Sequence, residues 1–254
     1  MAMNVEIIKP LLSNPDAELI YLRKTPSSNI TAKEKAPFLP HGSVVIAEEQ
    51  TEGRGRFERK FHSPPGTGIY MSVILKDVYD LRLITPAAAV AVCRAVISLA
   101  GKTPRIKWVN DILLDGGKIC GILTEAAGNT AVVGIGINYT TDFSGYTDYT
   151  GITAAAIFSK RERPLCSREE IAARVINELV NLSAETRTGA FMDEYRALSC
   201  LNGEEISYTQ NNEKHFGTVT GIDDTGRLLV KDGAGRITAL SSGEVMLVRK
   251  TGRN

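Results

Sequence analysis

The sequence predicts an α+β fold, in which a central mixed or antiparallel sheet carries helices and a small C-terminal β-barrel follows. Residues 85–100 form an alanine-rich run with helix signals at both ends. Residues 105–139 alternate between apolar and polar side chains and are interrupted by glycine turns, which is typical of an antiparallel meander. Residues 202–254 hold five short strand-like runs with polar turns between them, as in a small barrel or sandwich.

The helices are predicted from their end signals. Thr85 and Pro86 supply an N-cap and a proline at the first helical position, and Gly101 closes this helix. A second helix is expected after residue 167, because Ser167 and Glu170 have the spacing of a capping box and apolar residues follow at helical intervals. A shorter helical stretch is expected over residues 191–198.

The strands are predicted from runs rich in β-branched and aromatic residues. Before the meander, we expect strands over residues 43–47 and 69–76; the meander itself has three, over 105–115, 118–126 and 130–139. The C-terminal strands are expected over 204–209, 215–222, 227–232, 236–241 and 244–249. The composition changes near Leu201, which predicts one domain over residues 1–201 and a smaller one over residues 202–254.

The charge balance excludes a globally basic or acidic protein. Lys and Arg number 30 against 29 Asp and Glu, a formal charge of +1, so any binding of a polyanion must be local. No run approaches the roughly 18 apolar residues of a spanning helix; the longest, 86–93, ends at Arg94. No signal peptide is visible, and the four cysteines form no CxxC pair. We therefore expect a cytoplasmic protein with no membrane partner.

Residues 53–60 form the first candidate site. Four cations and one anion lie beside Gly53 and Gly55, shortly after Gln50. Glycine lets backbone N–H groups approach a ligand, and the planar arginine guanidinium suits a phosphate or carboxylate. The same composition also fits a solvated loop. It is not a Walker A loop, because no Gly-Lys-Ser/Thr follows at the required spacing.

A second candidate is the run 107–111. In one continuous strand, Lys107 and Asp111 share a face while Asn110 points to the other. A cation and a carboxylate on one face suit a phosphate and Mg²⁺, which prefers oxygen ligands. Taken alone, the pattern favours a cross-strand ion pair, which contributes under about 1 kcal/mol.

Two further segments of the meander hold candidate residues. Lys118 begins a returning strand, but a turn at residues 115–116 or at 116–117 would each be consistent with the sequence, so its facing partner stays open. Gly134, Gly136 and Asn138 resemble the start of a dinucleotide fingerprint, yet they lie in a strand and the third glycine is absent. Glycines inside a strand instead indicate close approach by a ligand or a neighbouring strand.

Taken in order, these segments resemble the catalytic domain of the biotin–protein ligase family. That family carries a Ser-Thr-Asn-type segment, a Gln ahead of Gly-Arg-Gly-Arg, a Lys-Trp-Pro-Asn-Asp strand, a K-x-x-G-I-L-x-E strand and a G-x-G-x-N strand. The matching residues here are 27–29, Gln50, 53–56, 107–111, 118–125 and 134–138. The resemblance spans roughly residues 20–200, and the strand-rich C-terminal segment is similar to the family's small SH3-like barrel.

The resemblance implies the class II synthetase-like fold of these ligases and a two-step reaction. Biotin and MgATP would give biotinyl-5′-AMP and pyrophosphate, and the biotinyl group would then pass to a lysine of a biotin carboxyl carrier domain. The ligands implied are therefore biotin, ATP and Mg²⁺, and the partner is a carboxylase's carrier domain. A homodimer is left open.

The resemblance also implies roles for matching residues. The implied biotin-binding residues are Ser27, Ser28, Asn29, Gln50, Gly53, Arg54, Gly55, Arg56, Lys118, Gly121, Gly134 and Gly136. The implied ATP-binding residues are Arg54, Arg56, Lys107, Asn110, Lys118 and Asn138. The implied catalytic residues are Arg54, Lys107, Asp111 and Lys118, with Asp111 also the metal ligand.

The sequence departs from the family pattern at four positions. Val109 stands where proline is usual, Ser28 replaces threonine, and Phe57 and Glu58 lie where arginine and glycine are common. None of these changes removes an implied role. Some members carry a DNA-binding domain ahead of the ligase; from the short stretch before Ser27 we expect none here and no DNA partner.

Two other functions compete with biotin ligation. A lipoate or octanoate ligase or transferase shares the fold family, but its acyl chain needs no polar cradle of the Ser, Asn and Gln kind. A non-enzymatic nucleic-acid-binding protein would use the cations of residues 53–60. The near-neutral charge and the acidic residues just before the loop disfavour this second alternative.

Overall fold

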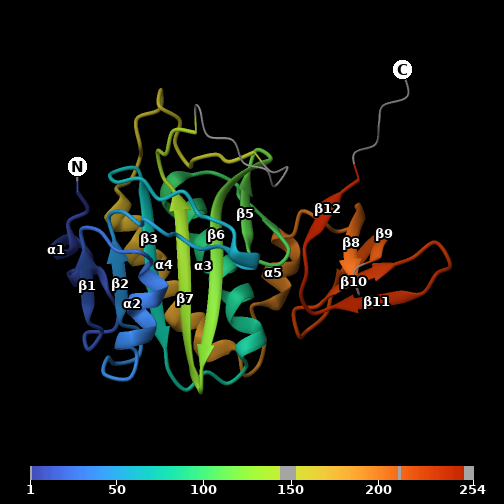
Figure 1. Cartoon of the computed structure of the whole chain (residues 1–254), viewed down its shortest axis with the longest axis horizontal. Coiled ribbons are helices and arrows are strands. Elements are labelled where there is room, and N and C mark those ends of the chain that lie inside the picture. The colour runs from blue at the N-terminus through green and yellow to red at the C-terminus, as the bar shows by residue number, and fades with distance from the viewer. Residues whose placement is uncertain (1, 144–152, 211–212, 249–254) are drawn as a thin grey trace.

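The computed structural model describes residues 2–143, 153–210 and 213–248, which build two sheets (Figure 1). The larger sheet has the strand order β1-β2-β3-β7-β6-β5-β4 and is mixed, because β1 and β2 are parallel and the other neighbours antiparallel. Its strands are β1 Leu19–Leu22, β2 Val44–Ala47, β3 Gly68–Leu75, β4 Arg105–Lys107, β5 Asp111–Leu114, β6 Gly117–Ala127 and β7 Thr130–Asn138. The predicted α+β class is confirmed.

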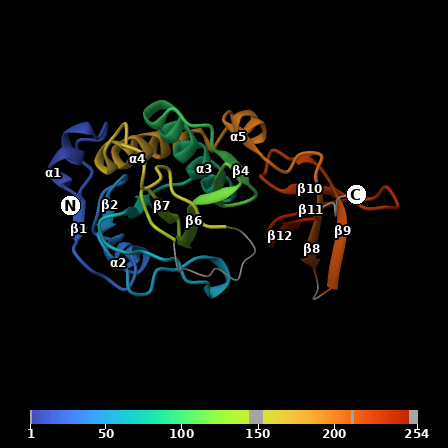
Figure 2. The ribbon, with the colours of Figure 1, turned by 90° about the horizontal axis from the view of Figure 1, so that it is seen from above.

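Helices cover both faces of this sheet (Figure 2). The α-helices are α1 Val5–Ile8, α2 Ser28–Lys35, α3 Ile84–Ala95, α4 Arg168–Glu185 and α5 Met192–Leu198. Single turns of 3₁₀ helix lie at Lys9–Leu11, Arg56–Glu58 and Leu81–Leu83. Helices α3 and α4 pack on one face over the main core, and α2 packs on the other, which explains why every residue of β3 is buried.

The α2 face of the sheet is only half covered by the helix. Ala32 of α2 and its C-cap residue Ala36 pack against Val45, Ile74 and Val132 of the sheet. Farther along the same strands, the side chains on this face become small: Ser72 of β3 pairs with Gly134 of β7, and Gly136 of β7 pairs with Gly121 of β6. The small side chains leave a hollow beside α2. The loop of residues 48–67, which joins β2 to β3, covers this hollow.

The long helix begins earlier than the sequence predicted. Its first turn is the 3₁₀ segment Leu81–Leu83, capped by Asp80, and Thr85 is already inside α3 with its hydroxyl 2.8 Å from that of Thr124. A π-helical turn, Val96–Ala100, then runs to Gly101, which ends the helix as predicted and has a left-handed conformation with φ 64°. The capping box of Ser167 at the start of α4 is confirmed.

The helical segment Leu81–Ala100 corrects the expectation that no run is apolar enough to span a bilayer. By length and composition alone it could cross a membrane. However, 72% of its apolar window is buried inside the fold, where it forms the centre of the core. It is therefore best explained as a core helix.

The expected single strand over residues 105–115 is wrong, because the chain reverses at residues 108–110 and forms two strands, β4 and β5. Two side chains in the turn hold it in place. Trp108 donates its indole N–H to the Gly226 carbonyl at 2.9 Å, and the Asn110 amide donates to the Ile122 carbonyl at 2.9 Å. Lys107 and Asp111 are consequently opposite each other on neighbouring strands instead of lying along one strand.

The second sheet is antiparallel in the order β11-β10-β9-β8-β12. Its strands are β8 Glu205–Gln210, β9 Glu213–Ile222, β10 Leu228–Lys231, β11 Ile237–Leu240 and β12 Val245–Leu247. All five predicted strands are present; residue 249, the end of the last predicted strand, lies outside the described residues. The chain passes from α5 to β8 through residues 199–204, and the division into 1–201 and 202–254 stays a prediction.

Candidate active site

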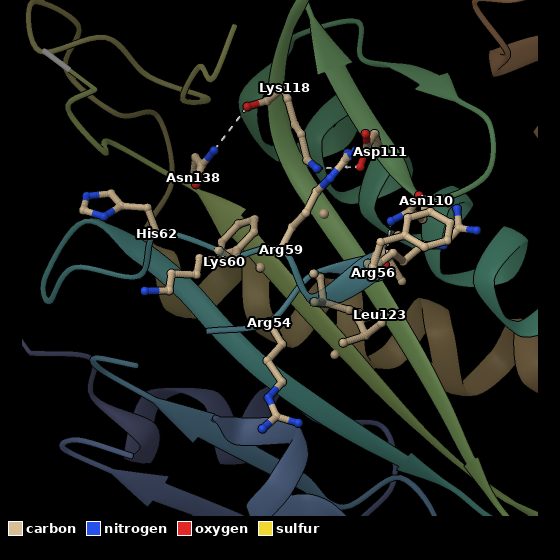
Figure 3. Close-up of a pocket in the computed structure, with 18 of the residues that line it drawn as sticks. Arg54, Arg56, Arg59, Lys60, His62, Asn110, Asp111, Lys118, Leu123 and Asn138 are labelled. Carbon is tan, nitrogen blue, oxygen red and sulfur yellow. Dashed lines mark hydrogen bonds and ion pairs between the residues drawn. The ribbon is translucent and has the colours of Figure 1, made fainter. Parts of the chain in front are cut away.

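The half-covered face of the large sheet holds a cavity of about 490 Å³. The sheet forms its floor, α2 one end and the loop after β2 its cover, and residues 243–245 of the C-terminal domain reach its rim (Figure 3). The predicted residues that line it are Ser27, Ser28, Asn29, Gln50, Arg54, Gly55, Arg56, Lys107, Asn110, Asp111, Lys118, Gly121, Gly134, Gly136 and Asn138. Arg56 and Lys118, from separate motifs, thus share one cavity.

Gly53 is the predicted site residue that does not line the cavity. A Cβ at this position would lie 2.4 Å from the Phe61 carbonyl oxygen and 2.7 Å from Ser63 Oγ. The two stems of the loop run side by side here, with the Phe61 N–H donating to the Gly53 carbonyl at 2.8 Å. Gly53 therefore shapes the loop.

One end of the cavity is polar and uncharged. Gln50 Oε1 accepts from the Ser28 N–H at 2.8 Å and from its hydroxyl at 3.1 Å, while Gln50 Nε2 donates to Ser63 Oγ at 2.9 Å. Ser27 occupies the N-cap of α2, yet its side chain makes no cap hydrogen bond. This end suits a neutral polar group that needs both donors and acceptors.

Ser72, which the sequence analysis missed, belongs to the same end. Its hydroxyl is fully buried and lies 2.8 Å from Ser28 Oγ and 2.5 Å from Asn29 Oδ1. The signal that could have found it is a hydroxyl residue in the middle of the otherwise apolar run 69–75. Such a residue in a buried strand needs a polar partner.

The middle of the floor is built from glycine, and a phenylalanine lies over it. Gly121 and Gly136 face each other across β6 and β7. A Cβ on Gly136 would lie 2.5 Å from the Phe61 ring, and one on Gly121 would lie 3.2 Å from it. Phe61, also missed from the sequence, therefore packs directly on these glycines and makes the middle of the cavity apolar.

The other end of the cavity carries charge. Lys118 Nζ lies 2.6 Å from Asp111 Oδ1, and Arg56 donates to Asn110 Oδ1 at 3.3 Å. Burial lowers the pKa of Lys107, and the nearby Asp111 carboxylate partly opposes that effect. Burial likewise lowers the pKa of Arg56. Three cations around one carboxylate give this end a net positive charge, which suits an anionic ligand.

The turn before Lys118 is now defined. Asp115 and Gly116 both have positive φ, 50° and 81°, so the hairpin turns at residues 115–116. Lys118 then pairs with Leu113, next to a β-bulge between Ile112 and Leu113. The register directs its ammonium group towards Asp111.

Asn138 lies beside Lys118 at the charged end. Its amide nitrogen donates to the Lys118 carbonyl at 3.1 Å, and its buried Oδ1 has no hydrogen-bond partner among the residues that the structure describes. A buried acceptor of this kind normally has a partner. Asn138 can therefore accept a hydrogen bond from a bound ligand.

Arg54 is not brought to the charged end. Figure 3 shows its guanidinium pointing away from Lys118 and Asp111. Its charge instead contributes to lowering the pKa of Glu125, near the polar end. The structure thus separates Arg54 from the other residues expected to be catalytic.

A contact from the C-terminal domain completes the charged rim. Both terminal nitrogens of Arg59 lie 2.5 Å from the carboxylate oxygens of Glu244. Glu244 lines the cavity, and the hydrogen bonds from Arg59 lower its pKa most, with Lys107 and Arg56 adding to the effect. The loop and the C-terminal domain therefore meet over the cavity.

The donor set is compatible with Mg²⁺ bound together with a phosphate ligand. No group of three or more His, Cys, Asp or Glu that could hold a metal ion occurs in the described part of the chain. Mg²⁺ in phosphate-transfer sites needs only one or two carboxylates, since substrate phosphates and water supply the remaining oxygens. Asp111 faces the cavity at the charged end and can supply that carboxylate.

Sequence comparison identifies the family. The profile of the Biotin/lipoate A/B protein ligase family matches residues 19–142, and that of the Biotin protein ligase C terminal domain matches residues 202–248. The bifunctional ligase/repressor BirA of Bacillus spizizenii is 33% identical over 230 residues, which cover 84% of this chain and 69% of that protein. The chain belongs to the biotin–protein ligase family.

Two further relatives of this biotin–protein ligase family member are informative. The biotin–[acetyl-CoA-carboxylase] ligase of Mycobacterium tuberculosis is 32% identical over 82% of this chain and 80% of its own length. The biotin protein ligase of Aquifex aeolicus, solved in complex with biotin and ATP, has a TM-score of 0.78 and 25% identity, and the match covers 92% of this chain and 99% of that one. The predicted class II synthetase-like ligase fold with a small C-terminal barrel is thereby confirmed.

Proposed function

We propose that this protein activates biotin with MgATP to biotinyl-5′-AMP and transfers the biotinyl group to a lysine of a carboxylase's biotin carboxyl carrier domain. One observation carries the proposal: a single cavity has one end where neutral side chains form a hydrogen-bond network, a middle where the Phe61 ring lies against glycines, and a cationic end. These three parts match the ureido head, the apolar body and the carboxylate of biotin in order, and the cationic end also suits the phosphates of ATP.

At the polar end, Ser27, Ser28, Asn29 and Gln50 would hold the ureido ring. An unpaired donor or acceptor buried here costs about 1–3 kcal/mol, so a ligand without the ring would bind less well. Gly121, Gly134 and Gly136 let the Phe61 ring and the Asn29 amide lie close against the strands, where a side chain on the glycine would collide with them.

At the charged end, the biotin carboxylate would attack the α-phosphorus of ATP. A carbon–oxygen–phosphorus anhydride forms, the bond to the leaving oxygen breaks, and pyrophosphate departs with the electron pair. Two anions must approach each other, so Lys118, Lys107 and Arg56 would stabilise the charge that develops on the phosphate oxygens. Asp111 would hold Mg²⁺, which when bound neutralises phosphate charge. Asn110 positions Arg56 through its hydrogen bond, and Asn138 would accept from the adenine side.

In the second step, the neutral amine of the carrier lysine would attack the biotinyl carbonyl and AMP would leave. The loop has to keep water from the anhydride until the carrier arrives, because water would hydrolyse it. Phe61 and Gly55 lie in the part of the loop that lines the cavity. We assign retention of the intermediate to this loop and to Arg54.

The remaining expectations stay predictions. Relatives named for acetyl-CoA carboxylase support a carboxylase carrier domain as the partner. We also expect a cytoplasmic location and no DNA or membrane partner, and a homodimer is left open. The nucleic-acid alternative is weakened, because Arg59 meets Glu244 and Arg56 turns into the cavity.

The proposal is tested by supplying the protein with MgATP, an unmodified carrier domain, and biotin, lipoate or octanoate in turn. We expect pyrophosphate release and a mass increase of the carrier when the acid is biotin, and neither when it is lipoate or octanoate. Attachment of lipoate or octanoate with biotin ignored would contradict the proposal. Tight nucleic-acid binding at physiological salt without pyrophosphate release would favour the binding-protein alternative instead.

A further inference from the structure

Glu125 lies just beyond the polar end of the cavity and has no role in the reaction described so far. It stands on β6, on the same face as Gly121 and Leu123, because side chains two residues apart share a face. Its carboxylate is half-buried and makes two short contacts with α2. Oε2 accepts from Asn29 Nδ2 at 2.9 Å, and Oε1 accepts from Lys33 Nζ at 2.6 Å.

The contact with Asn29 fixes which way that amide points. An ionised carboxylate and a backbone carbonyl are acceptors only, so they must face the NH₂ group of the amide. Asn29 Nδ2 donates to Glu125 Oε2 and, at 3.1 Å, to the Leu123 carbonyl, which uses both of its hydrogens. Asn29 Oδ1 therefore faces the opposite way, towards Ser72 and the space above Gly134.

An amide held in this orientation offers only an acceptor to a ligand. Asn29 is 4% exposed and lines the cavity. A ring N–H of a ligand can therefore donate to Oδ1, whereas a ring carbonyl at the same place would face the Oδ1 acceptor and form no hydrogen bond. Without the carboxylate, only the Leu123 carbonyl would hold the NH₂ group, so the orientation of the amide and this selectivity would be less firmly fixed.

Glu125 also attracts the arginine that points away from the charged end. Burial alone would raise the pKa of Glu125, but hydrogen bonds from Lys33 and Asn29 and the charges of Lys33 and Arg54 lower it. The carboxylate is therefore ionised at neutral pH.

We infer that Glu125 is a positioning residue for specificity: it holds the Asn29 amide as an acceptor for a ring N–H of the substrate. The inference rests on the proposed function, because it names how the site selects a cyclic urea. Lys33 contacts the other carboxylate oxygen and serves as a matched control, since its removal leaves the contact between Glu125 and Asn29 in place.

The first test compares biotin with two analogues, each with oxygen in place of one ureido N–H, by calorimetry without ATP. We expect Glu125→Ala to weaken biotin binding about tenfold, the size of one lost hydrogen bond. For the analogue lacking the N–H that faces Asn29, Glu125→Ala should cause only a small loss of affinity. The variant therefore no longer discriminates between biotin and this analogue. Lys33→Met keeps the discrimination. Equal losses for all three ligands, or the same collapse in Lys33→Met, would overturn the inference.

The second test measures how fast biotinyl-5′-AMP leaves the protein. We expect Glu125→Ala to speed release, because an Asn29 amide that is less firmly held loses its hydrogen bond to the ureido ring, and Lys33→Met to leave the rate unchanged. An unchanged rate in Glu125→Ala would overturn the inference. A wild-type protein that binds biotin but releases no pyrophosphate with MgATP would overturn the proposed function, whereas the calorimetry still decides the role of Glu125.

Discussion

Lys118 and Asp111 form an ion pair at the charged end of the cavity, with Nζ 2.6 Å from Oδ1. Asp111 Oδ1 makes no hydrogen bond to any other described residue, so the ammonium group is its direct counter-charge. Asp111 also stands opposite Lys107 across β4 and β5. One carboxylate therefore lies beside two lysines, and the three side chains form a site for a more highly charged phosphate ligand.

The first prediction concerns Lys118. We expect Lys118→Ala to slow adenylate formation by roughly 100-fold or more, the effect of removing one donor that stabilises developing charge. The thermal unfolding midpoint should move by only about 2–4 °C, as for a change of about 1 kcal/mol in a domain of this size. Pyrophosphate release in single turnovers measures the rate. Lys24→Ala, which removes an exposed ion pair with Glu49, is the control. An unchanged rate in Lys118→Ala would contradict the assigned role.

The glycine floor yields a second prediction. A Cβ on Gly134 would lie 2.3 Å from Asn29 Oδ1, so Gly134→Ala must displace an amide that several hydrogen bonds hold in place. We expect biotin binding to weaken by about tenfold or more, because a misplaced polar group loses its hydrogen bond to the ligand. Gly233→Ala is the matched control, since nothing lies within 4 Å of its added Cβ. If calorimetry gave the two variants equal biotin affinities, Gly134 would not belong to the site.

The sequence predicted those parts of the site that are encoded by local spacing. Glycines inside a strand indicated close approach, and Gly134 and Gly136 do meet the side chains of Asn29 and Phe61 at short distances. The start of α4 was also predicted correctly, since a capping box involves only residues that are close together in the chain.

Long-range contacts could not be predicted from spacing. The reversal at residues 108–110 depends on Trp108 reaching Gly226, which is 118 residues away. Arg59 and Glu244 are 185 residues apart, and no periodicity links them. The contact of Asn29 with Glu125, 96 residues away, likewise has no local signal in the sequence. The motifs thus identified residues that line the cavity, whereas tertiary packing determines at which end of it each cationic side chain lies.

The third prediction concerns the contact between the loop and the C-terminal domain. The side chains of Arg59 and Glu244 are partly exposed, at 42% and 28%, so Glu244→Gln should cost at most about 1 kcal/mol of stability. We expect biotinyl-5′-AMP to leave about fivefold faster, the equivalent of about 1 kcal/mol less stabilisation of the closed loop. Dissociation of labelled adenylate measures this rate. Asp232→Asn, which removes an exposed ion pair in the same domain, should leave it unchanged. Identical rates in Glu244→Gln and wild type would show that the contact does not hold the loop.

The last prediction concerns the base of the same loop, where Glu48 is buried. Its Oε1 accepts from the Gly66 N–H at 2.7 Å and from Arg168 at 3.2 Å, and its Oε2 accepts from the Met3 N–H at 2.8 Å. Burial raises the pKa of Glu48, but these hydrogen bonds and the Arg168 charge outweigh burial and leave the pKa below its ordinary 4.5. Both stems of the loop are therefore joined through one carboxylate.

A carboxyl group whose pKa is lowered by folding stabilises the folded state above its ordinary value. This stabilisation is lost as the pH falls from 4.5 through the lower pKa of the folded state. We expect Glu48→Gln to lower the free energy of unfolding by about 3–5 kcal/mol at neutral pH, because it removes the carboxylate charge that faces the buried Arg168 guanidinium. The difference from wild type should shrink as the pH falls below 4.5. Urea unfolding across this range measures it, with the exposed Glu6→Gln as control. A difference that stays constant with pH would mean that the charge of Glu48 contributes nothing and that only its shape matters.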